Sequence, residues 1–96
     1  MSVTTSPTIY NITLTVADTQ YSQLLPSGVR DIRFRCRTLF DVRFAFVTGK
    51  VATPTAPYLT LPAGSDYDSD DNDLSSKTIY FASSEAGVVV ELEVWC

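Results

Sequence analysis

The sequence contains no histidine, two cysteines, and lysine only at positions 50 and 77. Without histidine, the chain lacks the commonest general base and the commonest metal ligand. Two thiols are too few for a disulfide framework or, by themselves, for a structural zinc site. A lysine would have to activate any serine nucleophile, and Ser76-Lys77 alone forms no catalytic motif. We therefore expect a protein that is not an enzyme and that holds no cofactor.

Long apolar runs are also missing, and the longest clean ones are as short as residues 88–90. A membrane helix needs about 20 consecutive apolar residues, so we expect no contact with a membrane. Cys36 falls within an alternating segment and Cys96 is the last residue. Two reduced thiols are favoured over a disulfide between them, although the disulfide stays open as an alternative.

β-branched residues are abundant: 10 valines, 4 isoleucines and 12 threonines make up 26 of the 96 residues. Such side chains fit pleated sheets and lose rotamer freedom in helices, so the composition favours an all-β fold. A chain of 96 residues forms one domain with a thin core, to which a partner subunit would add buried surface.

Apolar and polar residues alternate along several short segments, as expected for half-buried strands. The predicted strands are 8–16, 21–25, 29–38, 42–48, 58–61, 77–82 and 88–95. Turn signals every eight to twelve residues predict one compact antiparallel β-sandwich of seven to eight short strands, either jelly-roll or immunoglobulin-like. The predicted boundaries are a flexible arm at 1–7 and the sandwich at 8–96.

The segment 42–48 is apolar on both faces except at Arg43. This pattern predicts a central strand or one covered by a neighbouring subunit. The final predicted strand also carries apolar residues on both of its faces. The apolar candidates for a subunit interface are Phe44, Phe46, Val47, Val89 and Trp95.

Basic residues gather in the first half of the chain, which holds six bases and three acids, whereas the second half holds one base and eight acids. Alternation places Arg33, Arg35 and Arg37 on one face of a predicted strand, with Arg43 expected nearby across a hairpin. Glu91 and Glu93 are spaced to match them. We expect these charges to pair within the chain or across an interface, because a net charge of −4 disfavours nucleic acid.

An acidic segment, 66–73, is predicted to be a solvated loop. Asp66, Asp68 and Asp70 have the spacing that begins an EF-hand. The match fails at its sixth position, which is Asp71 rather than glycine, and at its twelfth, which is Lys77 rather than glutamate. A calcium site of another kind, with the three aspartates as its ligands, remains the alternative.

Four segments resemble a family of small phage virion proteins of the capsid cement, or decoration, type. They are 21–28 (YSQLLPSG), 43–52 (RFAFVTGKVA), 57–64 (PYLTLPAG) and 78–95 (TIYFASSEAGVVVELEVW). The resemblance implies a compact β-sandwich with a structural role, bound to the major capsid protein on the virion surface after assembly in the host cytoplasm. It is a pattern of strands and turns, so it transfers no catalytic residue.

A cement protein that ties capsomers together is expected to form a homo-oligomer, with a trimer favoured over a dimer. Two alternatives remain from the sequence. One is another virion component, such as a head–tail connector, a spike or a tail protein. The other is a small lectin-like or calcium-binding module, for which Tyr67 and Trp95 would supply exposed rings.

Overall fold

The computed structural model describes residues 8–55, 57–69 and 76–95. These residues form eight β-strands and no helix, which confirms the predicted fold class. In chain order the strands are β1 (Thr8–Leu14), β2 (Tyr21–Leu24), β3 (Asp31–Cys36), β4 (Val42–Ala45), β5 (Leu59–Leu61), β6 (Asp66–Ser69), β7 (Thr78–Ala82) and β8 (Val88–Trp95). The predicted arm, residues 1–7, lies outside the described residues.

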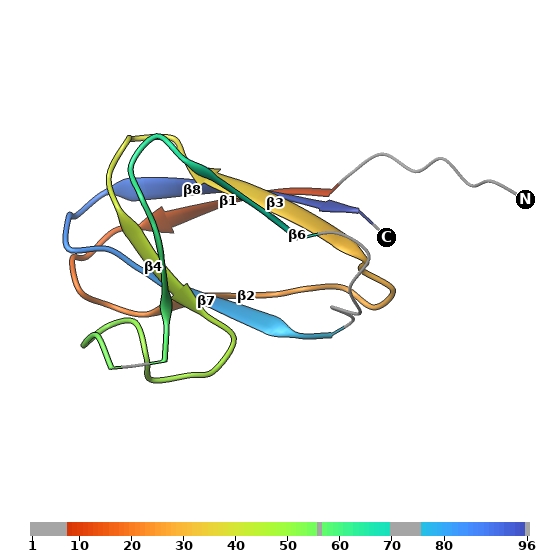
Figure 1. Cartoon of the computed structure of the whole chain (residues 1–96), viewed down its shortest axis with the longest axis horizontal. Coiled ribbons are helices and arrows are strands. Elements are labelled where there is room, and N and C mark those ends of the chain that lie inside the picture. The colour runs from red at the N-terminus through yellow and green to blue at the C-terminus, as the bar shows by residue number, and fades with distance from the viewer. Residues whose placement is uncertain (1–7, 56, 70–75, 96) are drawn as a thin grey trace, which may run out of the picture.

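The strands form two antiparallel sheets packed face to face (Figure 1). Sheet A has the order β1-β8-β3-β6 and sheet B the order β2-β7-β4-β5. Four pairings join strands whose numbers add up to nine: β1 with β8, β2 with β7, β3 with β6 and β4 with β5. The chain is therefore one long hairpin, rolled so that β8 also pairs with β3 and β7 with β4. This topology is the eight-stranded jelly roll.

The core lies between the two sheets and follows from the alternation along each strand. In β3, Ile32, Phe34 and Cys36 are buried while the arginines between them are exposed. The Phe34 ring meets Phe44 of β4 edge-to-face at 4.8 Å between centroids and Phe81 of β7 at 5.2 Å. These ring contacts connect the two sheets at the centre of the sandwich.

Strand β4 lies between β7 and β5, so the prediction that 42–48 forms a central strand is confirmed, although the strand ends at Ala45. Its outer face is covered by its own chain. The β4–β5 connection folds back over sheet B on the side away from sheet A (Figure 1). Val51 from this connection is fully buried there against Ala45 and Ala82.

Arg43 fixes this connection to the sheet. Its Nε donates to the carbonyl oxygen of Val51 at 2.7 Å, and its Nη2 donates to the carbonyl oxygen of Ala52 at 3.3 Å and to Asp18 Oδ1 at 2.8 Å. Arg43 thus lies on the outer side of sheet B, and the prediction that it neighbours the Arg33 row is wrong. The reason is the rolled hairpin, which places β3 and β4 in different sheets.

The acidic segment was predicted to be a loop, but its first residues form β6 at the edge of sheet A. Alternation along β6 turns Tyr67 inward, where its ring centroid is 5.0 Å from that of Phe34 and 4.8 Å from that of Phe44. Asp66 and Asp68 point to solvent on the other face. Tyr67 therefore packs against the core and is not the exposed ring that a lectin-like site would require.

Candidate binding surface

Sheet A carries a row of charges on each of three strands on its outer face, which we term the charged face. The alternation that buries the apolar residues of these strands turns the charged residues outward. The charged face comprises Arg33 and Arg35 of β3, Arg37 just after β3, Glu91 and Glu93 of β8, and Asp66 and Asp68 of β6.

The strand register brings opposite charges side by side. Arg33 pairs with Glu93 and Arg35 with Glu91 across β3 and β8. On the other side, Arg33 pairs with Asp68 and Arg35 with Asp66 across β3 and β6. The arginine row therefore runs between two acidic rows, and the predicted match between the arginines and Glu91 and Glu93 is confirmed in position.

Glu91 is the most strongly bonded residue of the charged face. Its Oε1 accepts from Arg35 Nε at 3.1 Å and its Oε2 from Arg37 Nε at 2.9 Å. Arg37 also donates to Asn11 Oδ1 on β1 at 3.3 Å, so this cluster connects three strands. The hydrogen bonds from Arg37 and then Arg35 lower the pKa of the Glu91 carboxyl below its ordinary value of 4.5.

The other charges are held more loosely. Arg33 lies 3.5 Å from Asp68 Oδ2, and both side chains are more than half exposed. Exposed pairs of this kind contribute little to stability. Glu93 Oε1 accepts from the indole N–H of Trp95 at 3.1 Å, which holds that ring beside the acidic row.

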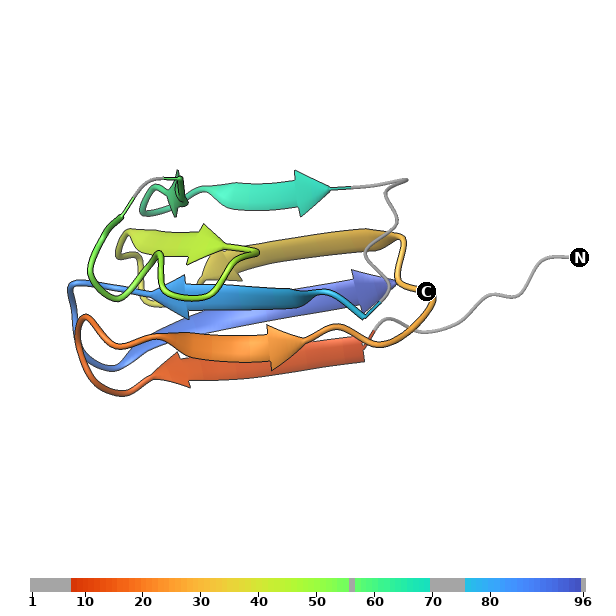
Figure 2. The same ribbon diagram turned by 90° about the horizontal axis from the view of Figure 1, so that it is seen from below.

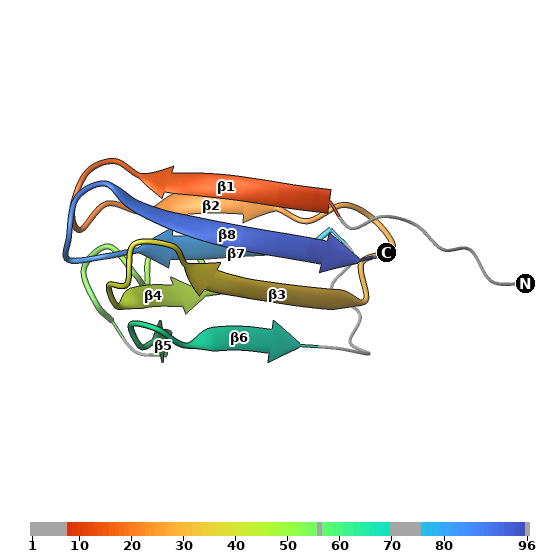
Figure 3. The same ribbon diagram turned by 90° about the horizontal axis from the view of Figure 1, so that it is seen from above.

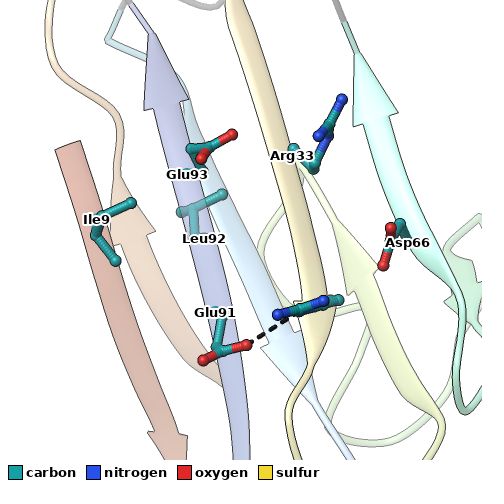
Figure 4. A pocket seen from close by; sticks show the side chains of 7 residues that line it. Ile9, Arg33, Asp66, Glu91, Leu92 and Glu93 are labelled. Atoms are coloured by element: carbon teal, nitrogen blue, oxygen red, sulfur yellow. Dashed lines mark hydrogen bonds and ion pairs between the residues drawn. The ribbon is translucent and has the colours of Figure 1, made fainter. Parts of the chain in front are cut away.

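An open groove of about 350 Å³ crosses the charged face (Figure 4). Ile9 of β1 lines one side and Asp66 of β6 the other, with Arg33, Arg35 and Glu91 between them. Ile9 is 56% exposed, so the groove joins charges of both signs to an apolar side chain. A surface of this composition suits another protein better than a polyphosphate backbone, because carboxylates flank the arginines on both sides.

The apolar interface candidates separate into two groups. Phe44 is 1% exposed and belongs to the core, so the prediction that it contributes to an interface is wrong. It points inward from a central strand whose partner layer is sheet A. Phe46, Val47 and Trp95 are exposed, and Val89 is half-buried on the outer face of β8.

Two of the three aspartates named as metal ligands lie on the charged face, and Asp70 is outside the described residues. Asp66 and Asp68 neighbour arginines in the register instead of a third acidic residue. Within residues 8–55, 57–69 and 76–95, no three histidine, cysteine, aspartate or glutamate side chains gather in a way that could hold a metal ion.

Sequence reasoning missed Ile9 and Asn11 as members of this surface. Their place became visible only with the pairing of β1 and β8, which sets Asn11 opposite Glu91 and Ile9 opposite Glu93. In the sequence, the segments that form β1 and β8 both alternate with a period of two. That period does not say which strands are neighbours.

Comparisons with family models, with curated proteins and with solved structures found no match to this chain. In the described part of the chain, no helix has the length and hydropathy needed to cross a membrane.

Replacing Glu91 with glutamine is expected to lower the melting temperature at neutral pH and to have a smaller effect in acid. Because folding lowers the pKa of Glu91, its ionised carboxylate stabilises the fold above pH 4.5, and this contribution is lost as the pH falls below that value. Thermal melts of both proteins across this range measure the difference. Glu85→Gln, which removes the same charge from the exposed β7–β8 turn, is the control and is expected to change little. A Glu91→Gln difference independent of pH would contradict this role.

Proposed function

We propose that this chain is a non-enzymatic structural protein of a bacteriophage virion, of the capsid cement type. In this role it binds the major capsid protein on the outer surface of the shell and acts as a homo-oligomer. The sequence resemblance in four segments is the origin of the proposal. Those segments fall on β2, β4, β5, β7 and β8 with their connections, so they belong to the framework of the jelly roll.

The observation that carries the proposal is the charged face. Three rows of charge are mounted on hydrogen-bonded strands of one sheet, where they hold fixed positions relative to one another. Ordered rows of both signs provide the electrostatic complementarity that sets the register of a protein partner. The exposed Ile9 and Trp95 near these rows supply apolar contact area.

Jelly rolls occur in capsid and lectin domains alike, so the fold is compatible with the proposal but does not select it. Only the residues on the surface can distinguish a capsid-binding protein from a lectin with the same fold. A cement protein needs a rigid face that docks on a repeated partner, and it needs no reacting groups. The charged face has this character, with its charges paired in part within the chain and in part open to solvent.

Replacing Arg35 with glutamate is expected to weaken binding to purified capsid shells at least tenfold. The substitution places a third negative charge between Glu91 and Asp66, so like charges repel at the centre of the charged face. Co-sedimentation with shells that lack this protein measures the binding. The shells should come from the phage whose genome encodes the chain.

Lys77→Glu is the matched control, because it makes the same change in net charge at an exposed residue outside the charged face. It is expected to bind like the wild type. Equal loss of binding in both variants would indicate a non-specific effect of net charge and would contradict docking through the charged face.

The lectin-like alternative has one specific observation in its favour. Trp95 is 38% exposed and lines a second hollow of the charged face together with Arg33, Asp68 and Glu93. Exposed aromatic rings beside paired polar groups also suit sugars. Specific binding to a glycan array that Trp95→Ala abolishes, with no binding to shells, would replace the cement proposal with this one.

A further inference from the structure

Each sheet has two edge strands, and these lie along the two long sides of the sandwich. Strands β1 and β2 follow one side, and β5 and β6 follow the other (Figures 2 and 3). Free backbone N–H and C=O groups at an edge are a template for pairing with another strand, and proteins commonly prevent this with short strands, charges or proline.

Three of the four edges have such protection. Strand β2 has four residues and β5 has three, with Pro62 directly after it. Strand β6 has four residues and carries Asp66 and Asp68. Strand β1 differs, because it extends over seven residues, TIYNITL, and none of them is charged or proline; Pro7 precedes the strand but lies outside the stretch 9–13. Four of its residues are β-branched, which favours strand pairing.

The ladder shows which backbone groups of β1 point away from sheet A. The N–H of Arg37 donates to the carbonyl oxygen of Val89, so the backbone groups of Val89 point toward β3. In an antiparallel sheet the N–H and C=O of one residue point to the same side, and the side alternates along the strand. The odd-numbered residues of β8 therefore bond to β3 and the even-numbered residues bond to β1. Through the register of β1 with β8, the even-numbered residues of β1 bond to β8. The N–H and C=O groups of Ile9, Asn11 and Thr13 therefore face the free edge.

We propose that β1 pairs with β1 of a second copy of this chain, antiparallel and about a two-fold axis at Asn11. This register sets Asn11 opposite Asn11 of the second copy, and Ile9 opposite Thr13 in both directions. All three outward N–H groups and all three outward C=O groups of each strand then find partners. The inference concerns the chain itself and does not depend on the virion role.

A second copy is favoured as the occupant because the edge is complementary to itself. No charge lies on β1, so a two-fold contact opposes no like charges along the strand, whereas pairing of β6 with its own copy would oppose aspartates. The inner side of this edge is also apolar. Tyr10 and Ile12 of β1 and Tyr21 of β2 are only partly buried against the core. A second sandwich at this edge would cover them and continue sheet A across the axis.

Asn11→Pro tests the contact, because it removes an N–H that faces outward and leaves the bonds between β1 and β8 in place. Proline is tolerated on an edge strand when its missing N–H faces solvent. The wild-type chain is expected to have twice the 10.6 kDa mass of one chain in light scattering. Asn11→Pro is expected to raise the dimer dissociation constant about 10- to 100-fold, since two symmetry-related donors are lost. Asn11→Ala keeps the N–H and is expected to remain dimeric.

Ile9→Lys is the second test, and it tests the pairing of β1 with β1 even if Asn11→Pro fails to fold. A lysine on an edge strand opposes pairing, and Ile9 is exposed, so the monomer itself should tolerate it. Leu59→Lys makes the same kind of change on edge strand β5, at a residue of similar exposure, 52% against 56%, and should leave the dimer intact. A wild-type monomer or trimer, or a dimer that persists in both Asn11→Pro and Ile9→Lys, would overturn the proposal.

Discussion

Replacing Phe44 with alanine is expected to lower the free energy of unfolding by about 3–5 kcal/mol, the usual range for a phenylalanine in a closed core. Phe44 is 1% exposed, and its ring contacts both Phe34 and Tyr67 edge-to-face at 4.8 Å. Its removal therefore leaves a cavity between the two sheets and withdraws two aromatic contacts. Domains of this size have about 5–15 kcal/mol of stability in total, so a large fraction is lost. Urea denaturation of both proteins measures the difference.

Phe46→Ala is the matched control, since the two phenylalanines lie only two residues apart in the sequence. Phe46 follows the end of β4 and is 37% exposed. Its replacement is expected to lower the free energy of unfolding by only about 1 kcal/mol, because the ring is already open to water in part and leaves no closed cavity. A result in which Phe46→Ala destabilises the fold as much as Phe44→Ala would show that both rings belong to one buried layer, contrary to the structure.

The second large effect is expected at Arg43, where methionine in its place should cost about 2–3 kcal/mol of stability. The guanidinium donates to the carbonyl oxygens of Val51 and Ala52 and to the Asp18 carboxylate, and its side chain is only 14% exposed. Hydrogen bonds to a charged group contribute more than neutral ones, and removal of the donor leaves acceptors without partners. Thermal and urea unfolding measure the loss.

Arg33→Met is the control for Arg43→Met, because it removes an arginine whose partner, Asp68, is 3.5 Å away on an exposed surface. We expect it to change stability by less than about 1 kcal/mol. Arg43→Lys is expected to remain clearly destabilised, since an ammonium group does not reproduce the planar fork that reaches both segments. Full recovery of stability with lysine would mean that the charge alone matters at this position.

The fold class was predictable because its main signal is local. Alternation with a period of two marks a strand wherever it occurs, and the predicted strand at 88–95 agrees with β8. Shorter strands were predicted too long at their ends. The segment 42–48 ends as a strand at Ala45, because Phe46 begins the connection that covers sheet B. Apolar and polar residues can also alternate by chance in a connecting segment. The alternation therefore does not show at which residue the strand ends.

The arrangement of the strands could not be predicted in the same way. Arg43 was expected beside Arg33 because the two lie in successive predicted strands, and a hairpin would have made them neighbours. The rolled topology separates them into different sheets and pairs β3 with β8 and β6 instead. The match of the arginine row with Glu91 and Glu93 was nevertheless predicted, because rows of opposite charge with the same spacing attract each other across strands.

The acidic segment was predicted wrongly for a different reason, since its first residues form a strand rather than a loop. Asp66 and Asp68 dominated its interpretation as a loop or a calcium site, whereas the structural role belongs to Tyr67 between them. The ring of Tyr67 packs on Phe34 and Phe44, and this contact draws the segment into sheet A as β6. One inward aromatic residue therefore outweighs two exposed carboxylates, because burial of a ring stabilises the strand more than solvation of its neighbours opposes it.

The proposed virion role is tested most directly by the number of copies that bind to one capsid shell. We expect saturable binding of the wild-type chain to shells that lack it, at a fixed ratio to the major capsid protein, as a lattice of equivalent sites requires. Quantitative gel densitometry of purified, saturated particles gives this ratio. Binding of only a few copies per particle would instead indicate a connector, spike or tail protein, and no binding at any concentration would contradict the virion role.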